Sequence, residues 1–172
     1  MDSNNANARP TPFVERLFSF LNYIEIIAVI GTAVGLMLQY LGKPGGLEIL
    51  NIFMSLLAMT FFLRGYQPRP VKNEKDTEVS GQFDLVAKTI APKAGWIACS
   101  AATIGILFHL LGLKGAGEML MIGTGTLTTV LVVMGIYIAV KSDQVAPLMP
   151  FIYRAVPVWL ASAYFFLPYL PG

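Results

Sequence analysis

The residue of this chain best placed for chemistry is Glu25, which lies in the apolar run Asn22-Tyr-Ile-Glu-Ile-Ile-Ala28. If this run crosses a bilayer, its carboxylate is costly to bury and normally has either a partner or a function. One interpretation is structural: Glu25 lies just inside the headgroups and pairs with a cytoplasmic arginine or lysine, or becomes protonated. The other is functional: Glu25 is a proton- or cation-responsive site.

Three further polar residues lie near the ends of apolar stretches. Glu48 and Glu118 each follow a glycine turn and fall in the first turn of an expected helix. There a carboxylate meets the positive end of the helix dipole and can accept from unpaired N–H groups. We interpret both as helix caps, with an ion or partner site as the alternative. His109 is expected to make an interhelical hydrogen bond rather than to bind a ligand.

Most catalytic constellations are missing from the sequence. With one histidine and one cysteine, there is no two-histidine metal site, no multi-cysteine metal site and no intramolecular disulfide. Cys99 lies in an apolar stretch and is expected to pack as a small hydrophobe. The net charge of +2 is too small to indicate nucleic-acid binding. We therefore expect a protein that is not an enzyme, with no cofactor, no metal site and no nucleic-acid partner.

The segments that carry these residues are long and apolar. Apolar residues make up 55% of the chain, charged residues 13%, and the mean hydropathy is +0.64. A membrane helix needs about 20 apolar residues. Four segments qualify, at residues 19–41, 47–65, 94–113 and 117–140.

These four segments form two similar hairpins. Shifting the sequence by 70 residues aligns residues 41–52 with 111–122, and six positions are then identical: Leu41/Leu111, Gly42/Gly112, Gly45/Gly115, Glu48/Glu118, Leu50/Leu120 and Ile52/Ile122. The short glycine turns must join antiparallel neighbours. The sequence predicts an all-α integral membrane protein with two tandem transmembrane hairpins, related by a pseudo-two-fold axis along the membrane normal.

The basic residues predict the orientation. With the N-terminus inside the cell, Lys43 and Lys114 lie outside. The other ten lie inside: Arg9, Arg16, Arg64, Arg69, Lys72, Lys75, Lys88, Lys93, Lys141 and Arg154. This positive-inside bias predicts a multi-pass protein of the bacterial inner membrane with a cytoplasmic N-terminus.

The remaining segments divide the chain further. Residues 1–18 form a polar N-terminal segment before hairpin 1 at residues 19–65. A cytoplasmic loop at residues 66–93 contains an expected amphipathic helix on the inner membrane face, with Phe83, Val86 and Ile90 at helical spacing. Hairpin 2 follows at residues 94–140.

The proline-rich apolar segment at residues 141–172 is expected to contain a short fifth helix. A proline-kinked span is favoured over a re-entrant or interfacial helix. In a span, Arg154 would lie just inside the inner interface and snorkel outward.

Small residues predict where helices approach closely. Gly31 and Gly35 in the first span align with Ala101 and Gly105 in the third. Small residues four positions apart form a flat stripe on a helix, which allows two backbones to come together.

The hairpins resemble the membrane subunit of the gliding-motility and type IX secretion motor of Bacteroidota. In that family a short Pro-Gly-Ala-type turn joins two helices and a Met-Leu-x-Ile-Gly run follows. The matching residues are Pro44-Gly45-Gly46 with Ile49-Leu50-Asn51-Ile52, and Gly115-Ala116 with Met119-Leu120-Met121-Ile122-Gly123. The resemblance implies a buried glutamate in the second helix that couples proton flow to rotation. The aligned residues here are Leu57 and Leu127, so the hairpin is present without the proton-coupling residue.

We interpret the chain as a scaffold or accessory subunit of a larger inner-membrane assembly. Its expected partners are the lipid bilayer and other membrane subunits, or further copies of itself. The alternative is a small oligomeric transporter or channel in which Glu25 couples protons or cations, as does the first-helix glutamate of the small four-helix multidrug exporters.

Overall fold

The computed structural model describes residues 12–67, 86–140 and 148–169. Its elements are α1 (Pro12–Tyr40), α2 (Gly46–Gly65), a π-helical turn η2 (Val86–Ile90), α4 (Ala91–Leu110), α5 (Ala116–Val140), α6 (Met149–Phe166) and a 3₁₀ turn η4 (Leu167–Tyr169). Each of the five α-helices in the described ranges is long and apolar enough to cross a membrane. The chain is therefore an all-α, multi-pass membrane protein, as the sequence predicts.

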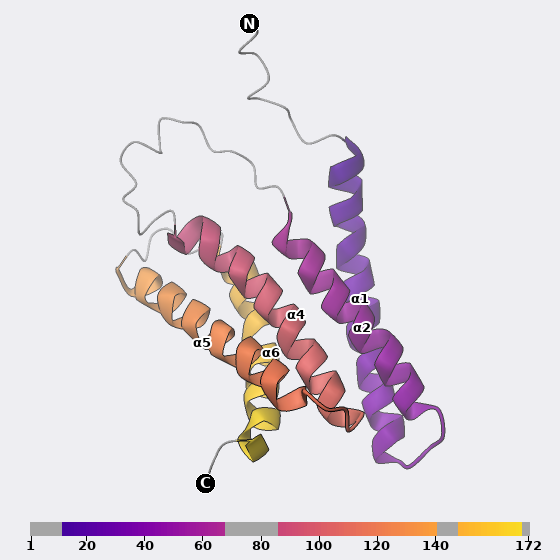
Figure 1. Ribbon diagram of the computed structural model, residues 1–172. Helices are drawn as coiled ribbons and strands as arrows, with labels where there is room; N and C mark the ends of the chain where they lie inside the picture. Colours follow the sequence, from indigo (N-terminus) through magenta and orange to yellow (C-terminus); the bar gives the residue numbers. More distant parts are fainter. Residues whose placement is uncertain (1–11, 68–85, 141–147, 170–172) are drawn as a thin grey trace, which may run out of the picture.

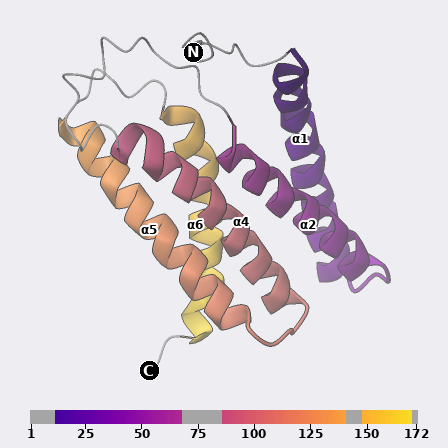
Figure 2. The same cartoon turned by 45° about the horizontal axis from the view of Figure 1, so that its top comes forward.

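The helices of the two hairpins lie in a row in the order α1, α2, α4, α5 (Figure 1). Neighbours in this row pack against each other along their length, and α6 packs against both α4 and α5. A second view likewise places α1 and α5 at opposite ends of the row (Figure 2). The hairpins thus meet through α2 and α4, and α1 packs along its length against α2 alone.

The two short turns have the same backbone conformation. Gly42 and Gly112 have φ of 64° and 65°, and Gly45 and Gly115 have φ of 87° and 88°. Lys43 N–H donates to the Leu38 carbonyl at 3.0 Å, and Gly42 N–H donates to the Gln39 carbonyl at 3.1 Å. This is a Schellman motif, in which a glycine with positive φ ends the helix. The second turn repeats both bonds, at 2.9 and 3.1 Å.

Several helix ends differ from the expected positions. The apolar span of α1, Phe20–Tyr40, agrees with the expected span at residues 19–41, but the helix itself already begins at Pro12. Proline is well tolerated in the first turn of a helix. Residues Val86–Ile90 lead directly into α4, so this part of the expected amphipathic helix extends a membrane helix. Phe83 lies outside the described residues. At the other end of the chain, α6 continues through Pro157 and provides the fifth apolar helix.

Glycines set the spacing within each hairpin. A Cβ on Gly35 would lie 2.9 Å from the backbone nitrogen of Leu50, and a Cβ on Gly105 would lie 2.9 Å from that of Leu120. Both glycines therefore lie where two helices touch, as expected. Gly31 likewise packs against the ring of Phe53.

The other expected stripe residue, Ala101, is only half-buried. The close contact at this level of hairpin 2 is between Gly123 and Ala102, because a Cβ on Gly123 would lie 2.6 Å from the Ala102 nitrogen. Gly123 is the residue that aligns with Phe53. At this level hairpin 1 has a large side chain, Phe53, on its second helix, whereas hairpin 2 has a glycine, Gly123, at the aligned position.

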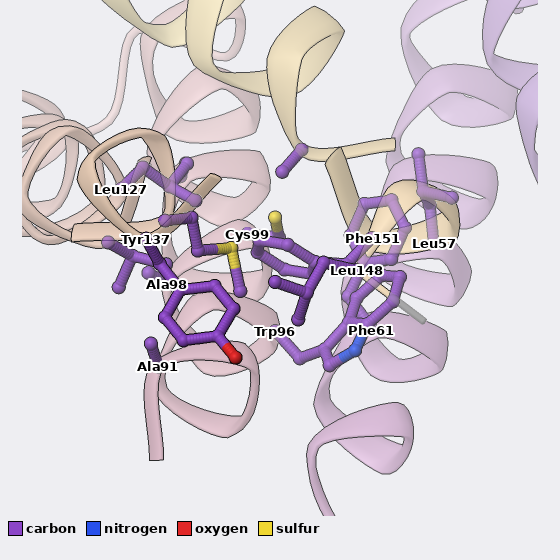
Figure 3. Packing of buried hydrophobic residues seen from close by; sticks show 14 of the residues in the cluster. Leu57, Phe61, Ala91, Trp96, Ala98, Cys99, Leu127, Tyr137, Leu148 and Phe151 are labelled. Carbon is purple, nitrogen blue, oxygen red and sulfur yellow. The ribbon is translucent and has the colours of Figure 1, made fainter. Parts of the chain in front are cut away.

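The main core lies where all five helices contribute side chains (Figure 3). Phe61, Trp96 and Phe151 come from α2, α4 and α6, and their rings are in contact. Cys99 is fully buried in the same cluster, and so is Leu127; Leu57 is 8% exposed. Leu57 and Leu127 are thus apolar core positions.

Candidate functional site

The Glu25 carboxylate joins three helices near one end of the molecule. It is 8% exposed, and it is the one buried carboxylate among the residues whose side chains the structure describes. Its Oε2 accepts from Arg64 Nη2 of α2, and its Oε1 accepts from Arg154 Nε of α6 at 2.7 Å. Both oxygens are therefore used by guanidinium groups, which supply the charge-assisted hydrogen bonds that a buried carboxylate needs.

Arg154 does not point away from the bundle as expected. It lies in the second turn of α6 and turns towards Glu25, while its Nη1 donates to the Pro150 carbonyl at 3.3 Å. Its side chain remains 35% exposed. Arg154 turns towards the buried carboxylate and not towards the headgroups, because an arginine gains more free energy from a hydrogen bond to a charged acceptor than from one to water.

Arg64 is the more deeply buried of the two arginines, with 10% of its side chain exposed. Its Nη2 also donates to Asn22 Oδ1 at 2.5 Å, and its guanidinium carbon lies 5.4 Å from the centre of the Trp96 ring. An arginine over an aromatic face gains cation–π attraction. Arg64 therefore connects α1, α2 and α4.

The position that aligns with Glu25 in hairpin 2 is Gly95, and it also faces α6. A Cβ on Gly95 would overlap the ring of Phe151. Phe151 and Arg154 are three residues apart, so they lie on the same side of α6. One turn of α6 thus contacts equivalent positions of the two hairpins, by an ion pair in one and by aromatic packing in the other.

An open groove of about 430 Å³ lies beside the Glu25–Arg154 pair. Its polar lining is Asn22, Glu25 and Arg154, and its apolar lining is Ile26, Val29 and Ile30 of α1. The polar residues lie at one end of the groove, and the apolar residues follow along α1. The groove therefore has a charged end and an apolar wall.

Glu48 and Glu118 are exposed in the first turns of α2 and α5. A Cβ on Gly45 would lie 3.5 Å from Glu48 Oε2, and a Cβ on Gly115 would lie 3.4 Å from Glu118 Oε2. Both carboxylates thus turn back towards the start of their helix. The N-cap of α2 is Gly45, which has no side chain to cap with, so the interaction available to Glu48 is with the helix dipole.

His109 makes an interhelical contact at the opposite end of the molecule from Glu25. Its Nδ1 lies 3.0 Å from the Tyr169 hydroxyl, and its ring packs against Phe165. Tyr169 follows α6, while Arg154 is near its start. Helix α6 therefore runs from the level of Glu25 to the level of His109.

Three other buried hydroxyl groups form hydrogen bonds within their own helices. The hydroxyls of Thr60 and Thr103 donate to carbonyls four residues earlier in their own helices, both at 2.8 Å. Ser162 donates to the Trp159 carbonyl at 3.0 Å. In the described parts of the chain, no group of three or more His, Cys, Asp or Glu side chains could hold a metal ion.

The sequence indicated that Glu25 needs a partner, but it did not identify Arg64 and Arg154 together. These residues lie 39 and 129 positions away along the chain. One signal was available: each arginine lies close to an end of its apolar segment, at the same level of the membrane as Glu25.

A scan of protein-family models and searches of curated proteins and of solved structures found no match to this chain.

Proposed function

We propose that this protein is a non-enzymatic scaffold or accessory subunit of a larger assembly in the bacterial inner membrane, with its N-terminus in the cytoplasm. The observation that carries the proposal is the engagement of Glu25 by two arginines. A carboxylate whose two oxygens bind guanidinium groups from α2 and α6 holds helices together. The buried carboxylate of Glu25 thus has a structural task.

The arrangement of the helices supports a role in assembly. Helix α1 lies at the end of the row and packs along its length against α2 alone. Large apolar side chains of α1 remain exposed, among them Val34 and Met37 at 46% and 65%. Lipid or a partner helix can cover such a face. In the motor family that the hairpins resemble, a proton-coupling glutamate would be needed, and Leu57 and Leu127 stand in its place here.

A transporter or channel is the second candidate, and the groove beside Glu25 favours it. In that case Glu25 would leave its arginines during transport. Against it, the buried hydroxyls of Thr60, Thr103 and Ser162 bond to their own helices and do not line a route across the membrane.

A pair of measurements separates the two candidates. For the scaffold, a photo-reactive residue at Val34 should cross-link in cells to one defined partner, whereas one at Val132 of α5 should cross-link to lipid. For the transporter, purified protein in liposomes should move a cation or substrate under a proton gradient, and Glu25→Gln should abolish the movement. Gradient-dependent transport that is lost in Glu25→Gln would overturn the scaffold proposal.

The orientation has its own test. In a Cys99→Ala background, cysteines at Lys43 and Lys114 should react with a membrane-impermeant reagent in intact cells. A cysteine at Gln67, at the opposite end of α2, should react only after the cells are opened. The reverse pattern would contradict a cytoplasmic N-terminus.

A further inference from the structure

The Glu25 cluster carries an unbalanced positive charge. Arg64 and Arg154 contribute two positive charges and Glu25 one negative charge, so the three side chains sum to +1. Nε of Arg64 is buried without a hydrogen-bond partner among the described residues. The guanidinium of Arg154 has five N–H donors, and its bonds to Glu25 and Pro150 use two of its nitrogens. An anion beside Arg154 would be stabilised by both the charge and the remaining donors.

The groove places this charge just below the lipid headgroups, inside the edge of the hydrocarbon layer. The apolar span of α1 begins at Phe20, so Glu25 lies about 7.5 Å along the helix axis from that end. Ile26, Val29 and Ile30 continue the groove lining to about 15 Å, which is near the middle of the hydrocarbon layer. All three side chains are at least half exposed.

We propose that this groove binds one anionic phospholipid, with its phosphate at Arg154 and an acyl chain along Ile26, Val29 and Ile30. Charge complementarity selects the anion, and the apolar wall selects a lipid over a free phosphate. Arginine suits a phosphate because its planar fork donates two hydrogen bonds. The site goes beyond the proposed assembly role, because lipid binding requires no partner protein.

The test is native mass spectrometry of the purified full chain in a mild neutral detergent. The protein is mixed with equal amounts of phosphatidylglycerol and phosphatidylcholine that have identical acyl chains. We expect one bound phosphatidylglycerol, retained about fivefold over phosphatidylcholine, the ratio given by one basic residue near an anionic headgroup. Equal retention of the two lipids would overturn the proposal.

Groove-filling variants locate the bound lipid. Val29→Trp places a bulky ring in the groove and leaves the ion pairs intact, so the preference for phosphatidylglycerol should disappear. Ile26→Trp is a second such variant, in case the first does not fold. Val132→Trp on α5, where the parent side chain is 55% exposed and lies outside the groove, is the matched control and should keep the preference.

Other occupants give different results. An unchanged preference in both groove-filling variants would place the lipid elsewhere. Displacement of the lipid by inorganic phosphate alone would show a simple anion site. A dimer that is lost on groove filling would show that a second copy occupies the groove. Each of these three results would overturn the proposal.

Discussion

Arg154 Nε lies 2.7 Å from Glu25 Oε1, and this contact joins the last helix of the protein to the first. The two residues are 129 positions apart in the sequence. Arg64 binds the other carboxylate oxygen, so one buried carboxylate holds α1 against both α2 and α6. The cluster thus adds a contact with α6 to the packing of α1 along α2.

The two arginines should differ in their contribution to stability. Arg64→Gln removes a side chain that is 10% exposed and leaves Glu25 short of a partner, which should cost about 3 kcal/mol, as for other broken buried pairs. Arg154→Gln removes a side chain that is 35% exposed, and its loss should cost about 1 kcal/mol because water and lipid headgroups can replace it. Unfolding by sodium dodecyl sulfate in mixed micelles measures both. A larger loss of stability for Arg154→Gln than for Arg64→Gln would contradict the expectation that the more buried arginine contributes more.

The glycine contacts give a matched comparison. Gly35→Ala and Gly105→Ala each place a Cβ 2.9 Å from a backbone nitrogen of the facing helix. Each should lower the free energy of unfolding by about 1–3 kcal/mol, as for other overpacked sites. Gly125→Ala is the control, because no atom lies within 4 Å of its Cβ position. The control should be neutral or slightly stabilising, since alanine favours a helix. Equal effects at all three sites would show that the close approaches are not tight.

The repeated glutamates should behave alike. Glu48→Gln and Glu118→Gln keep the size of the side chain but lose the charge at the start of α2 and α5, which should cost about 0.3–1 kcal/mol each. The loss should shrink at high salt, because both carboxylates are exposed. Thermal melting at low and high salt measures this. A loss of function at only one site, with unchanged stability, would instead indicate a binding role there.

The contact between His109 and Tyr169 should stabilise the end of α6. Tyr169→Phe removes the hydroxyl that lies 3.0 Å from His109 Nδ1, and the loss should be about 0.6 kcal/mol, the average for interhelical hydrogen bonds in membranes. Tyr164→Phe is the control, because that side chain is 69% exposed. Hydrogen exchange at the end of α6 should rise in the first variant alone. Equal exchange in both variants would argue against this hydrogen bond.

The sequence predicted what depends on local composition. Apolar length located four membrane helices and indicated a short fifth one, and glycine spacing located the two turns, because positive φ at Gly42 and Gly112 is a local requirement. The sequence did not predict which helices α6 would pack against. The inward turn of Arg154 and the fit of Phe151 against Gly95 both depend on the placement of α6 beside the hairpins. Such contacts between distant segments leave no periodic pattern in a single sequence.

The most direct test of the structural role of Glu25 is a double-mutant cycle with Arg154. Free energies of unfolding are measured in mixed micelles for the parent, Glu25→Gln, Arg154→Gln and the double variant. If the carboxylate joins α1 to α6, Arg154→Gln should cost about 1 kcal/mol in the parent and almost nothing once Glu25 is glutamine. If Arg154→Gln costs the same in both backgrounds, the two side chains do not stabilise each other, and Glu25 does not hold the helices together.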